Sequence, residues 1–198
     1  MPDYYQESYK AYHEATFSVD PSFFLGPFAK RVTDGALVLD VGCGSGRDLV
    51  WLQKQGCNVI GFERSSGLAD LARQNAGCEV IEGDFETYDF SQLTVDAILM
   101  SGSFVHLPHA RLAEAFRNVA QALKGQECTS RFACVSLKEG DGTKTDRDGR
   151  TFYLWQDDDL RRIFDRQGFS IIDFTKTKSA RGTGEVWLGY VLERNTGR

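Results

Sequence analysis

The chain has 198 residues, of which 41% are hydrophobic and 26% are charged, a composition typical of one globular domain with a substantial core. Its net charge of −5 argues against a broad surface for nucleic-acid phosphates, which would gather Lys and Arg. No stretch reaches 18 apolar residues, so we expect no membrane span and no signal peptide.

Cysteine usage bears on metal binding and on compartment. The five cysteines are Cys43, Cys57, Cys78, Cys128 and Cys134. They include no C-x-x-C pair, and no His/Cys cluster has zinc spacing, so we expect no metal site. An odd number without a disulfide framework indicates free thiols in a reducing compartment. We therefore predict a cytoplasmic protein.

Helical and strand-like patterns alternate along the chain. The predicted elements, in chain order, are helices over 3–14 and 20–32, a strand over 36–41, a helix over 47–55, a strand over 58–62, a helix over 65–75, strands over 79–82 and 95–100, a helix over 108–123, a strand over 132–137, a helix over 157–167, and strands over 169–178 and 185–193. Residues 139–150, rich in Gly, Asp, Lys and Thr, are predicted to form a loop. This alternation implies βαβ units and a mostly parallel seven-stranded sheet, with the last two strands as an antiparallel edge pair.

A glycine-rich turn follows the first predicted strand. Gly42, Gly44 and Gly46 come directly after the apolar run 36–41. Glycine permits positive φ angles and a close approach of backbone to ligand, because it lacks a Cβ. Glu63 ends the next strand, where a carboxylate can accept hydrogen bonds from both hydroxyls of a ribose. The pattern indicates a cofactor that contains a nucleoside.

The spacing of the turn distinguishes between cofactors. The dinucleotide fingerprint G-x-G-x-x-G needs a third glycine where this chain has Arg47. Asp40, two positions before the first glycine, would repel a pyrophosphate and suits a cationic ligand. A nicotinamide oxidoreductase is therefore disfavoured.

With Asp40 before G-x-G-x-G, the segment resembles motif I of the class I S-adenosylmethionine (SAM)-dependent methyltransferases. Glu63 and Asp84 fall where that family has acidic residues, and the resemblance covers residues 35–137. It implies an α/β, Rossmann-like three-layer sandwich, with SAM as cofactor and S-adenosylhomocysteine (SAH) as product. It also implies a single domain over 1–198, with a helical lid over 1–34, a cofactor-binding core over 35–138, and a closing helix and strands over 139–198.

The cofactor site expected from the turn, the strand ends and this resemblance comprises Asp40, Gly42, Cys43, Gly44, Arg47, Glu63, Arg64, Asp84, Phe85, Ser101 and Tyr12. In relatives, the residue at Asp84 contacts the adenine amino group and the residue at Phe85 stacks on the ring. A tyrosine of the lid often reaches the cofactor carboxylate, a role that Tyr12 could share with Tyr9; plain packing is the alternative. Arg47 either pairs with that carboxylate or is an exposed arginine of a first helical turn.

His106 is the candidate general base, because it follows the fourth predicted strand, where an acceptor should approach. The alternative is that it caps the following helix or orders the loop. Methyl transfer needs mainly alignment, so a base is optional.

Three cations of the C-terminal third, Lys138, Arg150 and Arg181, could gather around the acceptor and would then favour an anionic one. The alternative is a set of salt bridges to nearby Asp residues.

The favoured function is methyl transfer from SAM to a small molecule. A nucleic-acid methyltransferase acting on tRNA and a non-catalytic SAM-binding protein stay open as alternatives. The sequence carries no strong nucleic-acid signal and no signal for oligomeric state.

Overall fold

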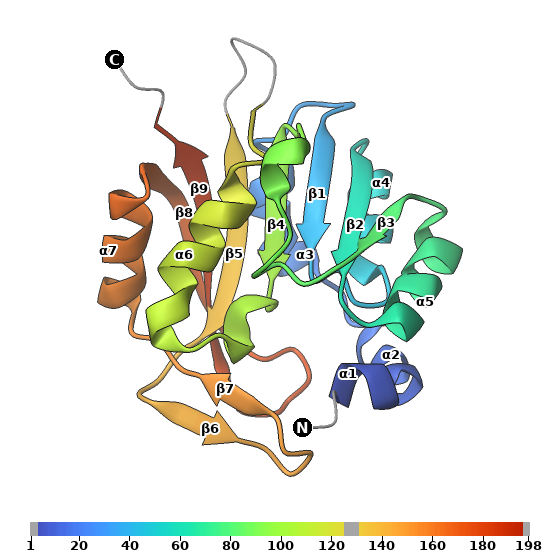
Figure 1. The fold of residues 1–198 in the computed structure, drawn as a ribbon. Helices are drawn as coiled ribbons and strands as arrows, with labels where there is room; N and C mark the ends of the chain where they lie inside the picture. Colours follow the sequence, from blue (N-terminus) through green and yellow to red (C-terminus); the bar gives the residue numbers. More distant parts are fainter. Residues whose placement is uncertain (1–3, 125–130, 196–198) are drawn as a thin grey trace.

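A computed structural model describes residues 4–124 and 131–195, and it forms a seven-stranded sheet between two layers of helices (Figure 1). The strand order is β3-β2-β1-β4-β5-β9-β8, with β1 to β5 parallel and β9 antiparallel to both β5 and β8. The strands are β1 (Leu37–Val41), β2 (Asn58–Glu63), β3 (Val80–Glu82), β4 (Ala97–Ser101), β5 (Phe132–Lys138), β8 (Phe169–Lys178) and β9 (Val186–Arg194). The predicted three-layer fold with its antiparallel edge pair is confirmed.

Two apolar cores lie on the two faces of the sheet. One contains Leu112 and Phe116 of α6 (His109–Ala120) and Leu160 of α7 (Asp157–Arg166). The other contains side chains of α3 (Ser22–Ala29), α4 (Arg47–Lys54) and α5 (Ser66–Ala76). Successive residues of a strand point to opposite faces, so the continuous apolar runs of β1, β4 and β5 supply both cores.

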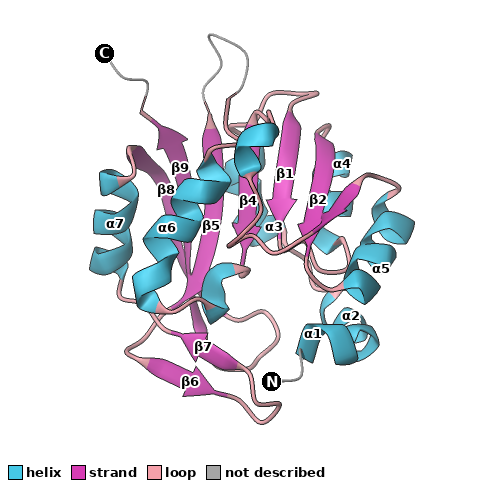
Figure 2. Ribbon diagram, viewed as in Figure 1, coloured by secondary structure: helices cyan, strands magenta, loops and turns pink. Residues whose placement is uncertain are grey.

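The N-terminal helix and the loop after β5 differ from the prediction. The predicted helix over 3–14 is broken at Ser8 into α1 (Tyr4–Glu7) and α2 (Tyr9–Thr16). The predicted loop over 139–150 contains β6 (Thr143–Thr145), which pairs antiparallel with β7 (Thr151–Tyr153) (Figure 2). The loop prediction is wrong there because β6 is exposed along its whole length and lacks the apolar alternation that marks a half-buried strand.

The ends of the parallel strands define where a ligand can bind. In Figure 1, the arrows of β1 and β2 point toward α1 and α2, and the β6–β7 hairpin lies at the same end of the sheet. In open α/β sheets, ligands bind beyond the carboxyl ends of the strands, at the point where the strand order reverses. Here that point lies between β1 and β4, beside the glycine turn.

Within the described part of the chain, no helix is long and apolar enough to cross a membrane. Four cysteines (Cys43, Cys57, Cys78 and Cys134) are free thiols. Cys128 lies outside the described residues.

Candidate functional site

The glycine turn after β1 is packed closely on both sides, and at Gly42 it leaves no room for a side chain. Gly42 has φ +75°, and its N–H donates to the Phe62 carbonyl at 2.7 Å. A Cβ on Gly42 would lie 2.5 Å from Cβ of Ser103. Gly44 has φ +55°, and a Cβ there would lie 3.5 Å from the Tyr12 ring. The turn is therefore bounded by the segment after β4 on one side and by α2 on the other.

Glu63 ends β2 beside this turn and is 8% exposed. Its Oε2 accepts from the N–H of Gly44 at 2.9 Å, and its Oε1 accepts from the N–H groups of Arg64 and Ser65, both at 2.9 Å. Burial raises the pKa of Glu63, and the three backbone donors oppose that rise. The carboxylate thus locks the turn to the end of β2 and leaves one lone pair free, on Oε2.

Two of the shielded polar atoms that have no hydrogen-bond partner among the described residues lie beside the glycine turn: Oδ2 of Asp40 and Oγ of Ser103. Asp40 lies on β1, two residues before Gly42, and Ser103 packs against Gly42. Burial and the neighbouring Asp48 raise the pKa of Asp40. Buried oxygens of this kind are costly unless a donor or a cation satisfies them.

Arg47 opens α4 and is already paired within the chain. Its Nε and Nη2 donate to the two carboxylate oxygens of the buried Asp48, at 2.6 and 2.8 Å. Neither sequence interpretation of Arg47 included this pair. Cys43, next to the turn, is buried, and burial raises the pKa of its thiol, so it packs as a neutral side chain.

The residues expected at the adenine lie after β2 and β3. Asp84 accepts the Glu86 N–H on Oδ1 at 2.9 Å, and its Oδ2 lies 3.8 Å from Nη1 of Arg64. The partly buried Phe85 ring contacts Phe104 edge-on, with centroids 5.1 Å apart. The structure therefore brings Arg64, Asp84 and Phe85 to the same end of the sheet.

The N-terminal helices cover this end of the sheet. Tyr12 of α2 lies over Gly44, and the ring of Tyr9 packs against Gly67 at the start of α5. Ser65 Oγ donates to the Tyr5 carbonyl at 2.9 Å. Burial raises the pKa of Tyr12, so its hydroxyl stays protonated. The tyrosines are thus packed as a cover on the turn.

His106 lies in a short 3-10 helix, η2 (Phe104–His106), with both ring nitrogens bonded. Its Nδ1 is 2.6 Å from the Thr151 carbonyl of β7, and its Nε2 is 2.7 Å from the Tyr5 hydroxyl. Its ring is stacked at a tilt on Phe152, at 4.6 Å. Burial lowers the pKa of His106. The residue therefore joins η2 to the hairpin and to the N-terminal cover.

Two of the three cations predicted to gather around the acceptor, Lys138 and Arg150, lie beside the same ring, that of Phe152. Lys138 is 7% exposed, with Nζ 3.6 Å from the Phe152 ring centroid and 3.1 Å from Glu185 Oε1. Arg150 lies 5.5 Å from the same ring. The third, Arg181, lies in the exposed turn between β8 and β9.

Arg150 also makes the salt bridges that the alternative interpretation expected. Its Nη2 lies 2.7 Å from Asp146 Oδ2 and 3.4 Å from Asp148 Oδ2. Its guanidinium stacks over Tyr4 of α1 at 4.2 Å. Arg150 is thus a second link between the hairpin and the N-terminal cover.

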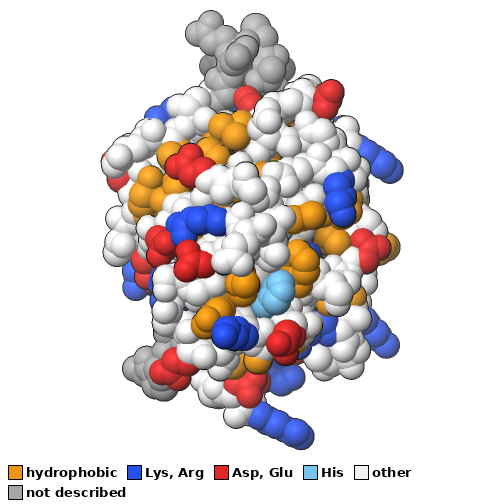
Figure 3. All heavy atoms as spheres, turned by 90° about the vertical axis from the view of Figure 1, so that its right-hand side faces the viewer, with side chains coloured by type: hydrophobic (Ala, Val, Ile, Leu, Met, Phe, Trp, Pro, Cys, Tyr) orange, Lys and Arg blue, Asp and Glu red, His pale blue; other side chains and the backbone are white. Residues whose placement is uncertain are grey.

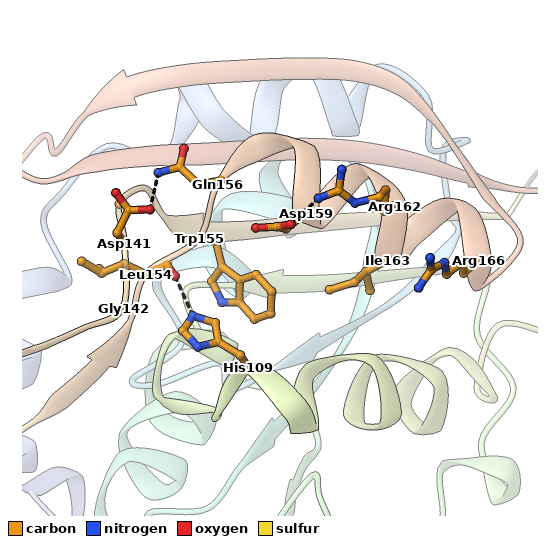
Figure 4. Close-up of a pocket in the computed structure, with 11 residues that line it drawn as sticks. His109, Asp141, Gly142, Leu154, Trp155, Gln156, Asp159, Arg162, Ile163 and Arg166 are labelled. Carbon is orange, nitrogen blue, oxygen red and sulfur yellow. Dashed lines mark hydrogen bonds and ion pairs between the residues drawn. The ribbon is translucent and has the colours of Figure 1, made fainter.

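A cavity of about 430 Å³ lies apart from the glycine turn, between the start of α6, the loop before β6, and α7 (Figure 4). His109 lines it, donates from Nε2 to the Leu154 carbonyl at 2.7 Å, and packs edge-on against Trp155. A second cavity, of about 340 Å³, lies over α6 near Glu86 and Arg111. Neither is lined by residues of the predicted cofactor site.

On the face shown in Figure 3, basic side chains are interspersed with acidic and apolar ones. This mixture matches the acidic overall balance of the chain.

Two residues of the site were not singled out by the sequence. Tyr5 is one of four tyrosines near the N-terminus, of which Tyr9 and Tyr12 were chosen for their helical spacing. Ser103 belongs to the segment expected to line the site, but its contact with Gly42 has no local signal. A glycine at position 42 indicates a backbone that a side chain would crowd. That signal could have drawn attention to the segment after β4.

Comparison with known proteins shows which proteins this chain resembles. A family profile described as a methyltransferase domain matches residues 38–126. An uncharacterized methyltransferase of Geobacillus sp. (strain WCH70) is 26% identical over 186 residues, which cover 85% of this chain and 86% of that protein. The cypemycin N-terminal methyltransferase of a Streptomyces species is 31% identical over 99 residues, covering 48% of this chain and 40% of that protein.

Solved structures share the fold. A SAM-dependent methyltransferase from Methanosarcina mazei superposes with a TM-score of 0.75 at 15% identity, covering 86% of this chain and 98% of the other. The 1,6-didemethyltoxoflavin-N1-methyltransferase of Burkholderia thailandensis, solved with 1,6-didemethyltoxoflavin and S-adenosylhomocysteine, gives 0.74 at 16% identity, covering 98% of this chain and 84% of the other. Sequence and fold agree, and this chain is similar to SAM-dependent methyltransferases, with a methyltransferase domain matched over residues 38–126.

Proposed function

We propose that this protein transfers the methyl group of SAM to a small-molecule acceptor, with SAH as the second product. The observation that carries the proposal is the pair of shielded, unpartnered oxygens beside the glycine turn, Asp40 Oδ2 and Ser103 Oγ. The ammonium group of SAM would supply the donors that these oxygens lack, which a pyrophosphate could not do.

The residues around the glycine turn and the ends of β2 and β3 fit the rest of the cofactor. Glu63 would receive a ribose hydroxyl on the lone pair of Oε2 that its backbone donors leave free. Asp84 and Phe85 would hold the adenine, and Tyr12 would close over the turn. When bound, SAM supplies a methyl group on a sulfonium that needs no further activation.

This chain's own contribution to the reaction is alignment and exclusion of water. The N-terminal helices cover the turn, and oriented reactants alone can lower a barrier by roughly 7–11 kcal/mol. His106 is the candidate base in this proposal, and Lys138 and Arg150 are the candidate groups for an anionic acceptor. Arg181, in its exposed turn, stays a weaker candidate for that role.

A small acceptor fits the chain better than a macromolecule. The N-terminal helices and the β6–β7 hairpin meet through Tyr5, His106 and Arg150, which encloses the acceptor side. Two of the similar structures are enzymes named for small acceptors, 1,6-didemethyltoxoflavin and magnesium protoporphyrin IX. The free thiols of the described cysteines also support a cytoplasmic location.

Calorimetric titration with SAH, SAM, NAD and a tRNA pool tests the cofactor and the acceptor class together. We expect saturable binding of SAH and SAM, none of NAD, and at most salt-sensitive, weak binding of tRNA. SAH release with pooled small phenols, amines and carboxylates then tests turnover. Binding of NAD in place of SAH would overturn the proposal, and tight tRNA binding would move it to the nucleic-acid class.

A further inference from the structure

Tyr5 lies where three segments of the candidate site meet. Its hydroxyl is 2.7 Å from Nε2 of His106, although the two residues are 101 positions apart. Its ring packs edge-on against Tyr12, which covers Gly44, with centroids 5.1 Å apart. Its backbone carbonyl accepts from Ser65 Oγ at the start of α5. Tyr5 thus connects the cover of the glycine turn with the acceptor side of the site.

The direction of the Tyr5–His106 hydrogen bond follows from the second partner of the imidazole. Nδ1 of His106 is 2.6 Å from the Thr151 carbonyl, and a carbonyl oxygen can only accept. Nδ1 therefore carries the proton of the neutral ring, and Nε2 presents its lone pair. The Tyr5 hydroxyl must be the donor to Nε2.

We propose that Tyr5 is a positioning residue of the methyl-transfer site: its hydroxyl holds the N-terminal helices closed over the glycine turn and fixes the ring of His106. The proposal rests on the proposed function. Nε2 has one lone pair, so His106 cannot take a proton from an acceptor while it accepts the Tyr5 hydrogen bond. Methyl transfer under the closed cover would therefore depend on alignment, and His106 could serve as a base only once this bond has opened.

The hydrogen bond also makes closure depend on pH. Burial lowers the pKa of His106, Arg150 and Lys138 lower it further, and Asp146 and the bond to the β7 carbonyl oppose them. Tyr5, the remaining titratable neighbour, has its own pKa raised by burial and stays protonated. Closure is complete above the ordinary histidine pKa of about 6.5 and weakens as the pH falls from there through the lower pKa of the closed state.

The first test compares Tyr5→Phe with Tyr153→Phe at pH 8. Both substitutions remove one tyrosine hydroxyl, and the Tyr153 ring packs edge-on against His109, which is not part of the cofactor site. We expect Tyr5→Phe to speed SAH dissociation about five- to tenfold, as expected for the loss of a hydrogen bond, and Tyr153→Phe to leave it unchanged. Equal rates for Tyr5→Phe and wild type would overturn the proposal.

The second test separates positioning from packing through the pH profile. Wild-type SAH dissociation should accelerate between pH 7.5 and 5.5, whereas Tyr5→Phe and His106→Phe should be fast and nearly flat. The double variant should be no faster than Tyr5→Phe, because that substitution already removes the bond to His106. A pH profile of Tyr5→Phe that parallels the wild type would contradict the proposal.

Hydrogen exchange of the free protein needs no ligand. It therefore distinguishes a failure of the Tyr5 proposal from a failure of the proposed function. Hydrogen exchange of residues 4–16 in the free protein should be faster in Tyr5→Phe than in wild type or Tyr153→Phe. If wild type fails to bind SAH, the proposed function is wrong, and the exchange experiment still decides whether Tyr5 holds the helices. Unchanged exchange in Tyr5→Phe would count against the closure itself.

Discussion

The carboxylate of Glu63 accepts the backbone N–H of Gly44 at 2.9 Å, which ties the end of β2 to the glycine turn after β1. One side chain therefore shapes the turn and, in the proposed function, also receives the ribose. Both roles depend on a charged acceptor in a nearly buried position.

Replacing Glu63 by Gln should weaken SAH binding at least tenfold, or about 1.4 kcal/mol, because a charged hydrogen-bond acceptor is lost. The measurement is calorimetric titration at pH 7.5. Glu82→Gln is the matched control, since Glu82 ends the neighbouring strand and is exposed, bonded to Arg73. Unchanged affinity in Glu63→Gln would remove that residue from the cofactor site.

Gly42→Ala should destabilise the fold more than Gly35→Ala. Both residues have similar positive φ, +75° and +77°, so both substitutions carry a backbone strain of roughly 1–2 kcal/mol. Only Gly42 adds a clash, since its Cβ would lie 2.5 Å from Ser103 Cβ, whereas nothing lies within 4 Å at Gly35. Urea unfolding measures the difference, and equal losses would show that the turn tolerates a side chain.

Asp40→Asn should stabilise the free protein and weaken SAH binding. Burial raises the pKa of Asp40, so the ionised carboxylate lowers stability as the pH rises above about 3.9, and an amide removes that effect. We expect a gain of about 1 kcal/mol in unfolding free energy at pH 7 and a roughly tenfold loss in SAH affinity.

Asp48→Asn is the control for Asp40→Asn. Asp48 is equally buried but paired with Arg47 at 2.6 Å, so its neutralisation should destabilise the protein. Loss of stability in both variants would show that Asp40 has a partner in the free protein.

Lys138 and Glu185 should be energetically coupled. Lys138→Met should leave Glu185 without its cation and lower the unfolding free energy by roughly 1–3 kcal/mol, and the added Glu185→Gln should restore part of it. A double-mutant cycle measured by urea unfolding should give a coupling above about 0.5 kcal/mol. Additive effects would mean that Lys138 is free to serve an acceptor.

The sheet and the glycine turn could be predicted because their signals are local. The apolar run of β1 leads directly into Gly42, and Glu63 ends the next run, so the two meet at one edge of a parallel sheet. The β6–β7 hairpin could not be predicted in this way. Its outer strand is polar and exposed, so its pairing leaves no periodic trace.

The contacts that assemble the acceptor side were also beyond the sequence. Tyr5 and His106 are 101 positions apart, and nothing near either residue specifies the other. The Arg47–Asp48 pair was missed for a different reason, because neighbouring residues of a helix do not ordinarily face each other. Tertiary packing determines both the Tyr5–His106 contact and the Arg47–Asp48 pair.

The most direct test of the account is a crystal structure of the protein with SAH. The account predicts the amino group of SAH within hydrogen-bond distance of Asp40 or Ser103, a ribose hydroxyl on Oε2 of Glu63, and the adenine beside Phe85. A groove left empty at saturating SAH, or SAH bound elsewhere on the molecule, would contradict it.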